Sequence, residues 1–127
     1  MKPFDGISVL LLEDEYLIAL DAEQILTSLG TGKVVIVNTL DGASAAAANG
    51  GFDVAVLDLN INGQMSYPIA EALRQQGIPV VFATGYEMRS RQAAEFPDSI
   101  YVTKPYTREA LRDAIVLTLE KNRPAAA

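Results

Sequence analysis

Charged and hydroxyl side chains stand where four of the five short apolar runs of this sequence end. They are Glu13, Asp14, Asp58, Thr84 and Lys104. Three carboxylates brought close together repel one another strongly, and they stay ionised together around a cation. An all-oxygen shell that includes water is what Mg²⁺ prefers. The sequence therefore predicts a magnesium site, provided that the fold gathers these run ends at one place.

Composition narrows the chemistry open to the chain. Its 127 residues include 16 acidic and 10 basic side chains, with no His, Cys or Trp. Disulfides, thiolate nucleophiles, imidazole bases and Cys or His metal sites are therefore excluded. The net charge of −6 argues against a nucleic-acid surface, which needs clustered Lys and Arg. Acid–base or metal chemistry must come from carboxylates, hydroxyls, lysine and backbone.

The apolar runs alternate with segments of helical period, which predicts an α/β fold. We expect strands over 7–12, 33–37, 53–59, 79–83 and 100–103. We expect helices over residues 15–29, 87–95 and 107–121. Two further helices are expected, one that Asp41-Gly42 opens and that stops at Asn49, and one with Pro68 in its first turn that reaches Gln76. Strands joined by helices run parallel, so their carboxyl ends meet at one edge of an open sheet with helices on both faces. Ligands of such folds bind beyond that edge.

Several local features extend this prediction. In helix 15–29 the side chains spaced three to four apart, from Leu17 to Leu29, predict the buried stripe. Asn62-Gly63 predicts a turn with left-handed backbone, and Thr107 predicts a helix N-cap.

The last helix has more apolar residues than one buried face needs. Two interpretations stay open: Val116 faces outward in a dimer or kinase interface, or the whole helix is well buried.

Four motifs carry a resemblance to a known family. They are Glu13-Asp14 after LLL, Asp58 at the end of VAVLD, ATG at 83–85 and TKP at 103–105. Over residues 7–119 the chain resembles the receiver domain of two-component response regulators. The resemblance implies a flavodoxin-like (βα)5 parallel sheet of order 2-1-3-4-5. It implies one domain over 1–127, with a core at about 7–120 and a flexible tail at 122–127.

The resemblance also assigns roles to the residues at the strand ends. Asp58 would accept the phosphoryl group, Asp14 would bind Mg²⁺ (or Mn²⁺) directly and Glu13 would bind it mainly through water. The backbone carbonyl of Asn60 would be a further ligand. Independently of the family, an Asp carboxylate is a competent nucleophile toward phosphorus. A lysine ammonium and a hydroxyl, here Lys104 and Thr84, can offset charge on the phosphoryl oxygens.

Three further expectations come from the family. Thr84 and Tyr101 would form the switch that reports phosphorylation, although Tyr101 also fits an ordinary edge-strand aromatic. The FATGY segment at 82–86 resembles a subgroup of stand-alone receivers. Tyr86 would overhang the site there, or simply pack on the surface. The Lys104-Pro105 bond is cis in the family, whereas trans is the commoner state of X-Pro bonds in general.

The missing histidine places the phosphoryl donor outside this chain. The expected partners are a sensor histidine kinase or a His-phosphotransfer protein and an unknown downstream protein. We expect a cytoplasmic protein that is a monomer or weak homodimer, contacts neither membrane nor nucleic acid, and is no enzyme beyond its own phosphorylation and dephosphorylation. The alternative is a pseudo-receiver that binds partners without phosphorylation. A flavin protein is disfavoured by the acidic loop after the first strand, and a phosphatase-type hydrolase by the acceptor's place on the third.

Overall fold

The computed structural model describes residues 4–85 and 99–121, and its centre is a five-stranded parallel sheet. The strands are β1 (Ser8–Leu12), β2 (Lys33–Val37), β3 (Val54–Asp58), β6 (Val80–Gly85) and β7 (Ile100–Lys104). They lie in the order β2-β1-β3-β6-β7. This is the predicted order 2-1-3-4-5 once the strands of the central sheet are numbered by themselves.

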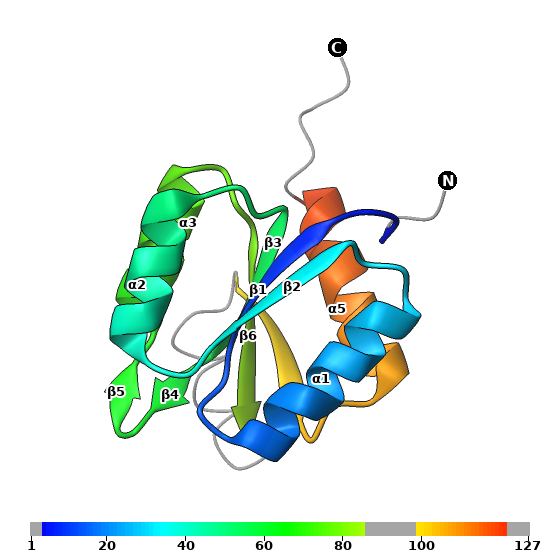
Figure 1. The fold of residues 1–127 in the computed structure, drawn as a ribbon, viewed down its shortest axis with the longest axis horizontal. Helices are drawn as coiled ribbons and strands as arrows, with labels where there is room; N and C mark the ends of the chain where they lie inside the picture. Colours follow the sequence, from blue (N-terminus) through cyan, green and yellow to red (C-terminus); the bar gives the residue numbers. More distant parts are fainter. Residues whose placement is uncertain (1–3, 86–98, 122–127) are drawn as a thin grey trace.

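Helices cover both faces of the sheet (Figure 1). They are α1 (Tyr16–Ser28), α2 (Leu40–Asn49), α3 (Tyr67–Gln75) and α5 (Arg108–Lys121). α1 and α5 lie on one face, and α2 and α3 lie on the other. The helix expected over 87–95 and the tail at 122–127 lie outside the described residues.

Alternation along each strand divides the core into two clusters. Val9 and Leu11 of β1 pack with the α1 and α5 side, whereas Leu10 and Leu12 pack with the α2 and α3 side. Residues 9–12 are all fully buried. A parallel strand covered on both faces is uniformly apolar, which is why these strands could be recognised in the sequence.

The buried faces of the helices differ in part from the predicted ones. In α1 the buried residues are Ala19, Ala22 and Leu26, while Leu17 is 78% exposed. The expected stripe that began at Leu17 was therefore wrong at its start, because the true stripe begins with small alanines. In α5, Val116 packs against the core, and it is Leu117 that is exposed.

A short hairpin that the sequence did not predict follows the third strand. It consists of β4 (Asn60–Ile61) and β5 (Gln64–Met65), paired antiparallel. The turn between them has positive φ at Asn62 (51°) and at Gly63 (85°), as predicted. The Thr107 cap is also confirmed, since its Oγ1 accepts a hydrogen bond from the Ala110 N–H at 3.1 Å.

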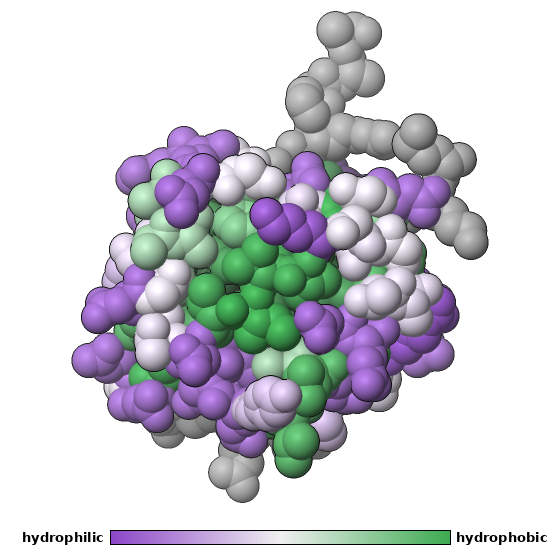
Figure 2. All heavy atoms as spheres, viewed as in Figure 1, coloured by the Kyte–Doolittle hydropathy of each residue, from purple (hydrophilic) through white to green (hydrophobic). Residues whose placement is uncertain are grey.

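The edge of the sheet at β2 forms the face shown in Figure 2. Apolar side chains gather at the centre of that face, and the β2 residues 34–37 are half-buried.

In the part of the chain that the structure describes, no helix has the length and apolar character to cross a bilayer.

Candidate functional site

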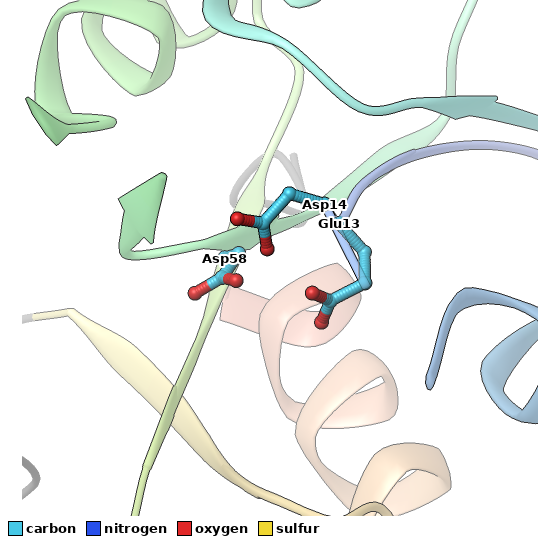
Figure 3. Close-up of side chains that lie close together, drawn as sticks. All are labelled: Glu13, Asp14 and Asp58. Carbon is cyan, nitrogen blue, oxygen red and sulfur yellow. The ribbon is translucent and has the colours of Figure 1, made fainter. Parts of the chain in front are cut away.

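Three carboxylates meet at the carboxyl edge of the sheet (Figure 3). Glu13 and Asp14 follow the last residue of β1, and Asp58 is the last residue of β3. One oxygen of each lies within 4.8 Å of the other two. Glu13 is 1% exposed and Asp58 is 4% exposed, so two of the three are held away from bulk water. The predicted gathering of these acids is confirmed.

Lys104 joins two of these carboxylates from the end of β7. Its Nζ lies 2.9 Å from Asp58 Oδ2 and 3.2 Å from Glu13 Oε1. Burial of the ammonium would lower the pKa of Lys104, but hydrogen bonds and charge from Asp58 and Glu13 outweigh it and raise that pKa. The side chain therefore stays charged and provides one positive charge among three acids.

Glu13 is the carboxylate with the most perturbed titration. Burial raises its pKa from 4.5 to about 7, and the nearby charge of Asp58 adds to this rise. A hydrogen bond from the Glu15 N–H to Glu13 Oε2, at 3.1 Å, and the pairing with Lys104 act in the opposite direction. The site thus concentrates more negative charge than its own residues neutralise.

An open pocket of about 370 Å³ lies beside Asp58. Its walls include Asn60, Thr84 and Lys104. The Asn60 N–H donates to Asp58 Oδ1 at 3.3 Å, so the Asp58 carboxylate is held by a backbone amide at one oxygen and by the Lys104 ammonium at the other. Thr84 is 3% exposed, and its hydroxyl donates a long bond of 3.5 Å to the Gly85 carbonyl. That weak contact leaves the hydroxyl able to turn toward a better acceptor.

Thr84 and Tyr101 lie on the same face of the sheet, on neighbouring strands. In the β6–β7 register Phe82 is opposite Tyr101 and Thr84 is opposite Thr103. Since side chains alternate along a strand, these four share the face toward α3. The Tyr101 ring is half-buried, with its centroid 5.8 Å from that of Phe82.

The remaining predicted site features have mixed outcomes. The Lys104-Pro105 bond is cis, as the family resemblance implied. Asn60 lies two residues after Asp58 and lines the same pocket, so its place is as expected, while the role of its carbonyl stays a prediction. Tyr86 lies outside the described residues, and its predicted screening of the site is untested.

Two contributors were missed from the sequence. Glu15 holds Glu13 through its backbone N–H, which leaves no trace in residue type. Tyr106 is 6% exposed, its hydroxyl has no hydrogen-bond partner within the described part of the chain, and burial with the charges of Glu13 and Asp58 raises its pKa. Its position directly after the TKP motif was the signal that could have pointed to it.

The donor set fits a hard divalent cation. Three carboxylates with one ammonium leave an excess of negative charge, and every candidate ligand atom is an oxygen. Mg²⁺ and Mn²⁺ suit such a set, whereas softer metals favour nitrogen or sulfur ligands. Glu13, Asp14 and Asp58 can therefore hold a metal ion of this class.

Two solved structures of one bacterial protein resemble this chain closely in fold. SdrG from Sphingomonas melonis Fr1 is 38% identical, with a TM-score of 0.75 over 90% of this chain and 97% of that one. The BeF3-activated conformation of SdrG, from Pseudomonas melonis Fr1, is 39% identical with a TM-score of 0.75, over 88% of this chain and 95% of that one.

A curated relative and a family model complete the comparison. The Bacillus subtilis sensory transduction protein LytT is 30% identical over 73 residues, which are 56% of this chain and 30% of LytT. The chain thus matches less than a third of that relative's length. The sequence model of the response regulator receiver domain matches residues 9–116. With the acidic site, the cis Lys104-Pro105 bond and the 2-1-3-4-5 sheet on the same segment, this chain belongs to the response regulator receiver domain family of two-component signalling.

Proposed function

We propose that this receiver accepts a phosphoryl group on Asp58 from a phosphohistidine of a partner protein, in a reaction that depends on Mg²⁺. The observation that carries the proposal is the placement of Asp58. Its Oδ2 is 2.9 Å from the Lys104 ammonium, two further carboxylates lie within reach, and an open pocket adjoins it. The donor is external because the chain has no histidine.

The transfer is a displacement at phosphorus. A carboxylate oxygen of Asp58 forms the new O–P bond while the P–N bond to the donor imidazole breaks, and the imidazole nitrogen keeps the electron pair and takes up a proton from solvent. Lys104 offsets charge that builds on the phosphoryl oxygens, and the Thr84 hydroxyl donates a hydrogen bond to one of them. The product is an aspartyl phosphate, a mixed anhydride that water can hydrolyse.

Glu13, Asp14 and Asp58 would hold the cation, together with the backbone carbonyl of Asn60. When bound, Mg²⁺ supplies positive charge to a phosphoryl oxygen. The chain's own contribution is to hold the ligands in place: Glu15 fixes Glu13 through its N–H, and the Asn60 N–H orients Asp58. The excess of acid charge gives the cation its affinity, and it would repel a phosphoryl donor if no cation were bound.

Phosphorylation becomes a signal through the face that Thr84 and Tyr101 share. A phosphoryl group on Asp58 gives the Thr84 hydroxyl a stronger acceptor than the Gly85 carbonyl at 3.5 Å. Movement of Thr84 frees space on the side of Tyr101, whose ring then packs more deeply against Phe82. The altered surface is read by a downstream protein, or the group is passed on or hydrolysed. In either case the chain catalyses no reaction but its own modification.

The test uses beryllofluoride, a phosphoryl mimic, and follows backbone amides by NMR. With Mg²⁺ present, we expect shifts at Asp58, Thr84 and Tyr101 in the native chain and none in Asp58→Asn. A matched control, Asp53→Asn, changes an exposed acid near the opposite end of β3 and should respond like the native chain. Equal responses of Asp58→Asn and the native chain would disprove Asp58 as acceptor. A native chain that does not respond would favour the pseudo-receiver alternative.

A further inference from the structure

A second cavity lies at the opposite end of the sheet from the carboxylates. It has a volume of about 350 Å³ and is formed where β6 and β7 begin, between the ends of α3 and α5. Arg74 of α3 and Lys121 of α5 line it from two sides. No acidic residue belongs to its described lining, although the whole chain carries a net charge of −6.

Arg74 is held over this cavity by neutral groups. One guanidinium nitrogen, Nη2, donates to Ser99 Oγ at 3.4 Å, a long contact. The guanidinium carbon lies 5.6 Å from the centre of the Phe82 ring. A planar guanidinium with such contacts keeps several donors for an anion, and it binds carboxylate or phosphate through two parallel hydrogen bonds.

The remaining lining of the cavity is largely apolar. Thr118 lines the cavity, is 4% exposed, and its hydroxyl has no hydrogen-bond partner among residues 4–85 and 99–121. That oxygen is itself buried from solvent, so Thr118 forms part of the wall without offering a hydrogen bond to the ligand. Val80 and Ile100 add apolar lining at the starts of β6 and β7.

We propose that this cavity binds a small organic anion, with a carboxylate or phosphate group on Arg74 and Lys121 and an apolar body against Val80 and Ile100. The volume falls at the small end of ligand pockets, which run from about 300 to 1,000 Å³. The positive charge of Arg74 and Lys121 favours an anionic ligand. The apolar lining favours an organic anion over a bare inorganic ion. Binding at this site needs neither Mg²⁺ nor phosphorylation, so the proposal can be tested independently of the function of Asp58.

The experiment titrates the unphosphorylated, Mg²⁺-free full chain with benzoate and follows backbone amides by NMR. Phenyl phosphate is the second probe, and benzamide and inorganic phosphate each lack one half of the proposed ligand. We expect saturable shifts at Val80, Ile100 and Thr118 with benzoate or phenyl phosphate, and much weaker ones with benzamide or inorganic phosphate. The stronger of the two aromatic probes identifies the anionic group that the site prefers.

Variants test whether the cations carry the binding. Loss of a charge-assisted hydrogen bond should weaken benzoate about tenfold in Arg74→Gln. Arg112→Gln is the matched control, because Arg112 lies on α5 outside the cavity lining and pairs with Asp113. Lys121→Gln, on an exposed residue, keeps the test independent of the Arg74–Phe82 contact. Benzamide binding as tightly as benzoate, or unchanged affinity in both cavity variants, would overturn the proposal.

Discussion

The carboxyl edge of the parallel sheet and the cavity at its amino edge differ in the charge of the side chains that form them. At the carboxyl edge, three carboxylates surround a single ammonium. At the amino edge, a guanidinium and an ammonium line a cavity whose described walls hold no acid. The net charge of the chain is therefore a poor guide to the charge of an individual surface.

Burial separates the two ends as strongly as charge does. Glu13 and Asp58 are buried at the carboxyl edge, whereas Arg74 and Lys121 are exposed at the amino edge. Holding buried acids together opposes folding unless a cation or a proton relieves them. Such a cluster, with one pKa raised to about 7, is typical of a functional site. Exposed cations cost little to maintain, so the amino edge imposes no comparable strain.

The largest expected difference between the ends concerns their lysines. Lys104→Met removes the ammonium beside Asp58, and we expect phosphorylation by acetyl phosphate to slow by about 100-fold or more. Lys121→Met makes the same change in charge at the other end and should leave that rate unchanged. Phosphoprotein formation over time, followed by intact mass, measures both. Similar slowing in both variants would mean that overall charge, and not the position of Lys104, controls the reaction.

The second difference concerns pH. The pKa of Glu13 is about 7 in the folded chain and 4.5 in the unfolded chain. Because the folded chain binds this proton more tightly than the unfolded chain does, the proton stabilises the fold fully below pH 4.5. This stabilisation is lost as pH rises through about 7. Without divalent cation, we expect the free energy of unfolding to fall across this window by at most about 3 kcal/mol.

Urea unfolding at several pH values measures this loss, with Glu13→Gln as the variant that should flatten it. Glu71→Gln, an exposed acid on α3, is the control and should keep the native slope. Mg²⁺ should restore stability at the upper end of the window, since it binds the ionised carboxylates of the folded state. A native slope retained in Glu13→Gln would assign the effect to another group.

The smallest expected difference lies between two threonines. Thr84→Val removes the hydroxyl beside Asp58 and should slow phosphorylation about tenfold. Thr118→Val removes a buried hydroxyl that no described residue hydrogen-bonds, so the stability of this variant should stay equal or rise, by about 1 kcal/mol at most. Acetyl phosphate kinetics and thermal unfolding of both variants provide the comparison. Slower phosphorylation in Thr118→Val would show that the two ends are coupled.

The sequence predicted the sheet and its acidic edge because both depend on strong local signals. Strands buried on two faces are uniformly apolar, and parallel order places their carboxyl ends together. The stripe of α1 was misplaced because Ala19 and Ala22 bury little apolar area, so the larger Leu17 dominated the pattern while lying in solvent. The hairpin at 60–65 was missed because two-residue strands have no period to detect.

Within the site, residue types were predictable but their pairing was not. That Lys104 contacts Glu13 as well as Asp58 depends on where side chains converge beyond the sheet edge, and residue identity alone does not show this. The raised pKa of Glu13 depends on burial, which is a property of the folded chain. The amino-edge cavity went unpredicted for the same reason, since Arg74 and Lys121 are far apart in the sequence.

The most direct test of Asp58 as phospho-acceptor is covalent labelling with acetyl phosphate and Mg²⁺. Intact mass should show the addition of one phosphoryl group, and borohydride reduction followed by peptide mapping should locate it at Asp58. The modification should disappear in Asp58→Asn and on chelation of Mg²⁺, and it should persist in Asp53→Asn. A phosphoryl group that forms equally in Asp58→Asn, or without any divalent cation, would contradict the assignment of this acidic edge as the phosphorylation site.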